Sequence, residues 1–139
     1  MKVENAFYPK ADQAVAFFGA AEDGPFVMVN LLKFKPKAEY PDGSDAELTG
    51  AQAYARYAAA VSKLVVELGG SVRYGGHVTG LMIGEVEELW DMVALAEYPS
   101  LAAFQQMATS EAYHAIEHHR TAGLAGQLNI RTKPASNSI

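Results

Sequence analysis

The sequence predicts an α+β fold in which a four-stranded antiparallel sheet carries two helices on one face. Three observations predict it. Residues 25–35, PFVMVNLLKFK, are nearly all apolar, which is typical of a strand that is covered on both faces. Residues 49–68 repeat apolar side chains at helical spacing. The segments follow one another as strand, helix, strand, strand, helix, strand, which is the order of the split βαβ in ferredoxin-like domains.

The first strand is expected over residues 26–35, after a short extra helix over residues 9–20 in which Pro9 suits the first turn. Adjacent strand residues point to opposite faces. The amide of Asn30 therefore shares a face with four large apolar side chains: Phe26, Met28, Leu32 and Phe34. The opposite face is apolar in its first half and ends in lysines: Val27, Val29, Leu31, Lys33 and Lys35.

The long helix is expected to begin after Thr49. A hydroxyl at this position with an amide three residues later, at Gln52, is a capping-box pattern. The helix should end at Gly69-Gly70, because glycine accepts the left-handed conformation that closes many helices.

The second half of the chain predicts the remaining elements. Residues 71–84 are interpreted as a strand that bends or bulges at Gly75-Gly76, since a glycine pair weakens a strand. Residues 89–98 predict a further strand. A helix with a second cap at Ser110 should follow and stop at Gly123. Residues 124–131 predict the last strand.

Between the first strand and the long helix lies a polar loop, residues 36–48, with two prolines and a Pro-Asp-Gly turn. Loops of this length often act as lids or partner contacts, but a mobile surface excursion is the favoured interpretation. No internal repeat or second domain is found. We expect one domain over residues 1–133 and a flexible tail over residues 134–139.

Composition excludes several classes of protein. A net charge of −5 disfavours a nucleic-acid-binding protein or one that docks on an anionic membrane. The chain has no cysteine, which excludes disulfides and thiolate chemistry. No signal-like N-terminus and no stretch of roughly 20 apolar residues is found. The sequence also lacks P-loop, GxGxxG and HExxH motifs. A soluble cytoplasmic protein without a cofactor is expected.

The predicted sheet implies a partner. Both helices cover the same face, yet the other face remains apolar in the first and third strands. A large exposed apolar face is unusual in a monomer, and two-fold pairing is the commonest way to cover it. We therefore expect a homodimer in which the two sheets form a shared, barrel-like core.

Several short motifs, in this order and spacing, resemble the DUF1330 family. They are VMVNLLKF, GAQAYARY, LGG, Trp90-Asp91-x-Val93 through EYPSLAAF, SEAY and Arg120. The resemblance covers residues 25–133 and implies a dimeric α/β barrel. The wider superfamily includes monooxygenases without metal or flavin, muconolactone-isomerase-like enzymes and haem enzymes. The resemblance also implies a small-molecule pocket between sheet and helices.

Three residues are candidates for catalysis. Asn30 places an amide in an apolar strand centre, where it must find a partner; it either fixes local packing or polarises a ligand oxygen. Asp91 is either a general base or half of an ion pair with Arg120, and the ion pair is favoured. Arg120 either complements the end of its helix or grips a substrate carboxylate.

Four residues are candidates for substrate binding: Tyr57, Trp90, Tyr113 and His114. The tyrosine hydroxyls would rim a pocket between helices and sheet, although buried tyrosines usually supply packing area. For Trp90, a place in the core or a dimer interface is favoured over a role as a ligand platform.

His114 and His118 are four residues apart, which is the spacing of metal ligands on a helix. No third ligand is evident for a cluster that also includes His119, although Glu111 or Glu117 could serve; no metal is expected, and a solvated helix face is favoured. His77 is a lone proton-transfer candidate or a strand-edge residue. A haem ligand stays open.

Two functions therefore stay open. The first is a small cofactor-independent enzyme, monooxygenase- or isomerase-like, that acts on a carbonyl or carboxylate compound; Asn30 would polarise an oxygen, Arg120 would fix an anion, and Asp91 or a histidine would move a proton. The second is a non-catalytic ligand-binding or structural dimer. Haem binding is a third, less favoured alternative.

Overall fold

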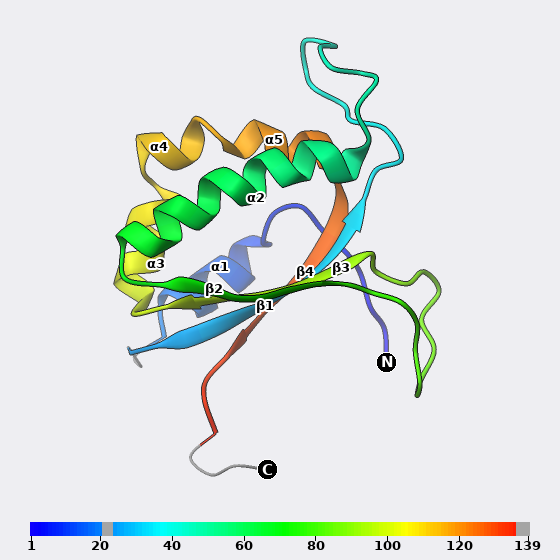
Figure 1. The fold of residues 1–139 in the computed structure, drawn as a ribbon. Coiled ribbons are helices and arrows are strands. Elements are labelled where there is room, and N and C mark those ends of the chain that lie inside the picture. Colours follow the sequence, from blue (N-terminus) through cyan, green and yellow to red (C-terminus); the bar gives the residue numbers. More distant parts are fainter. Residues whose placement is uncertain (21–23, 136–139) are drawn as a thin grey trace.

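The computed structural model describes residues 1–20 and 24–135, and its four strands form one antiparallel sheet in the order β2-β3-β1-β4. The strands are β1 (Phe26–Phe34), β2 (Ser71–His77), β3 (Met92–Tyr98) and β4 (Leu124–Thr132). The helices are α1 (Ala11–Phe18), α2 (Gly50–Glu67), α3 (Leu101–Ala108), α4 (Glu111–His114) and α5 (Glu117–Gly123). Figure 1 shows α2, α4 and α5 as a layer over one face of the sheet. The predicted element order and α+β class are confirmed.

The core lies between the sheet and this helix layer. The helix-facing side chains of β1 include Phe26, Met28 and Leu32, which are all buried. Residues of β3, α2 and α3 complete the main cluster with Phe26 and Met28: Val65, Tyr98, Leu101 and Met107. Asn30 lies in the same row, opposite Ala94 of β3 and Asn129 of β4. The sheet thus presents one amide toward the helices from the middle of an apolar row.

Helix α2 begins as the capping box predicts. The Gln52 backbone N–H donates to Thr49 Oγ1 at 3.1 Å, and the Thr49 N–H donates to Gln52 Oε1 at 2.8 Å. The first turn of α2 crosses the end of α5 at very short range. A Cβ on Gly50 would stand 2.7 Å from the Gly123 carbonyl oxygen, and one on Gly123 would stand 2.3 Å from the Gly50 oxygen. Only glycine at both positions permits this crossing.

The predicted strand over residues 71–84 is too long. Strand β2 ends at His77, and its irregularity falls between Val72 and Tyr74 rather than at the glycine pair. Residues 78–84 leave the sheet because β3 begins only at Met92, so no strand lies beside them. Gly76 still has a packing role, since the Tyr74 side chain folds over it with the hydroxyl oxygen 2.4 Å from the position of a Cβ.

The helix predicted between residues 100 and 123 is divided into three. Ser100 and Ser110 cap α3 and α4 as expected, accepting from the N–H groups of Ala103 and Tyr113. The predicted flexible tail falls mostly outside the described residues. Within the ranges that the structure describes, no helix combines the length and apolarity needed to cross a bilayer.

The loop over residues 36–48 is anchored rather than loose at its base. Ala38 and Tyr40 are buried against Ala53 and Ala122. The Glu39 N–H donates to the Ala122 carbonyl at 2.9 Å. The favoured interpretation of a mobile excursion therefore fails for the first part of the loop, and only its tip projects beyond α2 (Figure 1).

His119 holds the same loop in place. The Tyr40 hydroxyl forms a hydrogen bond of 2.7 Å with His119 Nδ1 and accepts from Arg56 Nη1 at 3.3 Å. Burial has the largest effect on the pKa of His119 and lowers it. The charges of His118 and Arg56 lower it further, and the charge of Asp45 partly opposes them. The neutral imidazole is therefore the form that the folded chain favours.

Stability should fall on acidification as a consequence. The pKa of His119 in the folded chain lies below the ordinary value of 6.5, which applies to the unfolded chain. Between these two pKa values the unfolded chain binds more protons than the folded chain. The free energy of unfolding therefore falls as the pH is lowered through this interval. Urea unfolding on both sides of pH 6.5 measures this loss. We expect His119→Gln, which keeps an acceptor for Tyr40, to flatten the slope, and His77→Gln at an exposed histidine to leave it unchanged.

Candidate functional site

A line of hydrogen-bonded polar side chains crosses the layer between sheet and helices. Asn30 Nδ2 donates to the Ala94 carbonyl of β3 at 3.3 Å, and its Oδ1 accepts from Gln127 Nε2 of β4 at 3.2 Å. Gln127 Oε1 in turn accepts from Arg120 Nη2 of α5 at 2.7 Å. These bonds satisfy the groups that burial would otherwise leave unpaired. The structure therefore links Asn30 to Arg120 through a residue that the sequence analysis missed.

Gln127 carries a signal that could have identified it. It is 7% exposed and is the buried polar residue among those described. Leu128 and Ile130 share the opposite face of β4, so strand alternation directs Gln127 toward the helices. A polar residue at an inward position of a strand therefore indicates a candidate site residue, as it does for Asn30.

Arg120 uses only part of its donor capacity. Its Nη2 also donates to the Phe7 carbonyl at 2.7 Å, and the guanidinium lies 5.8 Å from the centroid of the Tyr8 ring. A guanidinium carries five N–H donors, and the groups on Nε and Nη1 bond no described residue. No described carboxylate forms an ion pair with Arg120 either. The favoured ion pair between Asp91 and Arg120 is therefore wrong.

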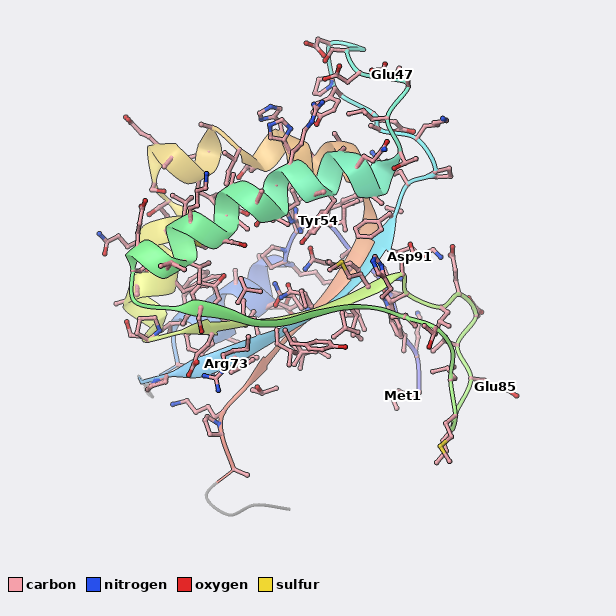
Figure 2. The ribbon with its side chains drawn as sticks, in the orientation of Figure 1. Met1, Glu47, Tyr54, Arg73, Glu85 and Asp91 are labelled. Atoms are coloured by element: carbon pink, nitrogen blue, oxygen red, sulfur yellow. The ribbon has the colours of Figure 1, made fainter. Side chains whose placement is uncertain are left out.

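Three tyrosines pack against one another, and the charge of Arg120 acts on two of them, Tyr54 and Tyr57. The hydroxyls of Tyr57 and Tyr113 are 3.1 Å apart, and the Tyr54 ring packs between Phe34 and Tyr57 with centroid distances of 5.3 Å to each. Figure 2 shows Tyr54 between α2 and the sheet. None of the described residues forms a hydrogen bond with the Tyr54 hydroxyl.

The tyrosines are hydrogen-bond donors rather than bases. Burial raises the pKa of Tyr54 to about 12, and the positive charge of Arg120 partly opposes this effect. Burial also raises the pKa of Tyr57 well above its usual range, and the positive charge of Arg120 again partly opposes this effect. Both hydroxyls therefore keep their protons at neutral pH. The site offers neutral O–H groups beside one partly used cation.

The other three predicted residues lie outside this cluster. Asp91, at the edge labelled in Figure 2, accepts from the Phe34 backbone N–H at 2.8 Å and lies 3.5 Å from Lys33 Nζ. Trp90 Nε1 donates to Asn5 Oδ1 at 2.7 Å. His114 is exposed and lies 3.7 Å from Glu117.

The N-terminal segment closes one edge of the cluster. Ala6 pairs with Gln127 through two backbone hydrogen bonds, of 3.0 and 2.9 Å. This pairing holds the Phe7 carbonyl and the Tyr8 ring against Arg120. The segment therefore positions the guanidinium, and no motif in residues 1–8 predicts this role.

An open groove of about 840 Å³ at one end of the sheet includes Asp91 and His77 among its lining residues, together with Lys33 and Lys35. Both lysines already contact carboxylates, Asp91 for Lys33 and Glu39 for Lys35. Across the residues that the structure describes, no three His, Asp or Glu side chains are arranged to hold a metal ion.

Comparison with known proteins agrees with this architecture. The family model DUF1330, a domain of unknown function, matches residues 44–132. The structure is similar to RPA0582, a protein of unknown function from Rhodopseudomonas palustris, at 34% identity and a TM-score of 0.85, over 96% of this chain and 100% of that chain.

A more distant similarity is to a dimeric ferredoxin-like protein of unknown function from Jannaschia sp. CCS1. It has 16% identity and a TM-score of 0.52, over 80% of this chain and 100% of that chain. A comparison with curated proteins found no match. The predicted ferredoxin-like fold is confirmed.

Proposed function

The chain belongs to the DUF1330 family of domains of unknown function, and we propose that it binds a small carboxylate or carbonyl compound between its helices and its sheet. The observation that carries this proposal is that the positive charge of Arg120 is not paired with a described carboxylate. This partly buried cation is held in place by two neutral oxygens, those of Phe7 and Gln127, and has no described carboxylate partner. Such a cation is stabilised by an incoming anion.

The remaining donors suit such a ligand. Arginine donates charge-assisted hydrogen bonds to carboxylates, and the N–H groups on Nε and Nη1 remain as single donors on two edges of the guanidinium because Nη2 already bonds Phe7 and Gln127. The Tyr54 hydroxyl lies in the same layer, keeps its proton, and has no described partner. It would donate to a second oxygen of the ligand. Charge and a neutral donor together select a small acid or a keto acid rather than a cation.

A further question is whether the chain also catalyses a reaction of the bound compound. In an isomerase- or monooxygenase-like reaction without a cofactor, Asn30 and the tyrosine hydroxyls would stabilise negative charge on a carbonyl oxygen. Such a reaction also needs a group that removes a proton. The raised pKa values of Tyr54 and Tyr57 make them poor bases, and Asp91 and His114 lie outside the cluster. Binding is therefore the function that the geometry supports best, and a non-catalytic binder is the alternative.

Calorimetric titration tests the proposal by comparing the affinity for pyruvate, benzoate and succinate with the affinity for the corresponding amide of each acid. We expect at least one acid to bind and its amide to bind more weakly. Arg120→Gln should weaken binding by about 10- to 100-fold, the effect of a lost hydrogen bond to a charged group. The control is Arg73→Gln, because Arg73 is exposed and pairs with Glu97 away from the cluster. Equal affinity in wild type and Arg120→Gln would contradict the proposal.

We also propose that the chain pairs with a second copy through the face of the sheet that the helices leave open. That face carries large apolar side chains of three strands: Val29, Leu31, Val93, Leu95, Leu128 and Ile130. The chain exposes 8991 Å², about 2,000 Å² more than a compact monomer of this mass would expose. An excess of this size suits an obligate homodimer. The related fold from Jannaschia is described as dimeric, which is consistent with this pairing.

A further inference from the structure

The connection between β2 and β3, residues 78–91, forms an arm that stands away from the rest of the chain. Its tip has three consecutive large apolar side chains, Leu81, Met82 and Ile83, which are 50%, 97% and 84% exposed. Most hairpin loops have only two to five residues. Figure 1 shows the arm leaving the sheet on the side opposite the helix layer, and Figure 2 labels Glu85 on it.

The base of the arm is firmly held. The Val78 N–H donates to the Asp91 carbonyl at 2.9 Å, and the Asp91 N–H donates to the Leu32 carbonyl at 2.8 Å. Lys33 Nζ donates to the Leu89 carbonyl at 3.0 Å and lies 3.4 Å from Glu88. These bonds tie the Glu88–Asp91 end of the arm to β1 and hold its other end, Val78, against Asp91. A fixed base lowers the entropy that a binding element loses on docking.

The tip, in contrast, has open space around it. A Cβ on Gly80 or on Gly84 would meet no described atom within 4 Å. A run of exposed apolar residues is unfavourable in water unless it serves a function. The firm base and the open tip together indicate a surface that is presented to a partner.

We propose that this arm is a clasp, and that its Leu81-Met82-Ile83 tip packs on the second copy of the chain. The inference rests on the homodimer proposed above. The arm extends toward the same side as the open sheet face, so a second copy laid on that face meets it. Burial of the arm also accounts for part of the excess surface of about 2,000 Å² on each chain. The acidic flank of Glu85, Glu87 and Glu88 disfavours an anionic membrane as the occupant.

Sedimentation over a concentration series of Met82→Ser/Ile83→Ser tests the clasp. We expect the dimer dissociation constant to rise by about 30-fold or more, because central apolar anchors dominate an interface. The matched control is Val15→Ser/Val66→Ser, which removes two exposed apolar side chains, 73% and 63% exposed, from helices. An unchanged dissociation constant in the arm variant would overturn the clasp.

Cross-linking locates the tip directly. The chain has no native cysteine, so Met82→Cys gives one site for a photoreactive maleimide. In a mixture of ¹⁴N- and ¹⁵N-labelled protein, we expect cross-linked peptides of mixed isotope composition, whereas Val66→Cys should give none. Cross-links confined to one chain would overturn the clasp.

The two proposals fail in different ways. If wild type is dimeric and Leu95→Lys on the open face dissociates it while the arm variant does not, the sheet pairing stands and the clasp is overturned. If wild type sediments as a monomer at all concentrations, both the pairing and the clasp are overturned. Binding of wild type to anionic vesicles through Met82 would replace the second copy with a membrane and also overturn the clasp.

Discussion

Gly123→Ala is expected to lower the free energy of unfolding by about 3 kcal/mol, near the upper end of the usual effect of overpacking. The added methyl would stand 2.3 Å from the Gly50 oxygen and 2.7 Å from the Tyr54 nitrogen. Both atoms belong to the backbone of α2, so no side-chain rotation relieves the contact. Helices α2 and α5 must separate, and this opens the packed layer beside Arg120.

Urea unfolding of Gly123→Ala and Gly80→Ala provides the measurement and its control. Gly80 has no atom within 4 Å of the added methyl and no left-handed backbone conformation. Its substitution should change the free energy of unfolding by less than about 0.5 kcal/mol. Equal stability of the two variants would show that the helices are not in backbone contact at Gly123.

The same glycine shows what a sequence pattern does and does not contain. A glycine after a helical segment predicts an end to the helix, and Gly123 does end α5. Its contact with Gly50 joins two segments that are distant in sequence, and no local pattern encodes that pairing. The helix boundary was therefore predictable, whereas the reason that only glycine fits became visible in the fold.

Asp91 is an instructive error. The expected partner is Arg120, at the end of the helix that the sequence predicts after this strand. The register places Leu32 opposite Met92, so Lys33 and Asp91 meet across neighbouring strands. Cross-strand neighbours on one face pair more readily than residues on different layers. The predicted faces were correct, but the register that selects the partner was not available from the residue pattern.

Asn30 and Arg120 show the opposite outcome. Each was selected alone, the one for a polar group among apolar neighbours and the other for its place on a helix. The structure joins them through Gln127. The strand predicted over residues 78–84 is absent for a different reason. Their apolar character favours a strand, but a strand requires a hydrogen-bonded neighbour, and β3 begins only at Met92.

The expected effect of Gln127→Leu is likewise a loss of about 3 kcal/mol in the free energy of unfolding. Leucine has a similar volume but removes the donor to Asn30 Oδ1 and the acceptor from Arg120 Nη2. A stranded buried acceptor costs about 1–3 kcal/mol, and a hydrogen bond to a charged group contributes about 1.5–3 kcal/mol. Arg120 keeps the Phe7 carbonyl, which limits the second loss.

A double-mutant cycle separates this network from simple packing. Asn30→Leu alone removes a different part of the chain of bonds and leaves Gln127 Nε2 without its acceptor. In the double variant the bond between residues 30 and 127 leaves no stranded group, while the losses at Arg120 and at the Ala94 carbonyl remain, so the total loss should be smaller than the sum of the single losses by about 1–2 kcal/mol. Urea unfolding of all four proteins gives this coupling energy.

The cycle also bears on ligand binding. If the network holds Arg120 ready for an anion, Gln127→Leu should weaken binding of an acid, while Asn30→Leu, which leaves the Gln127–Arg120 bond in place, should weaken it less. Strictly additive losses of stability, with equal affinities in both single variants, would mean that Asn30, Gln127 and Arg120 act as separate packing residues. A coupled cycle with unequal affinities would show that the buried amides position the guanidinium.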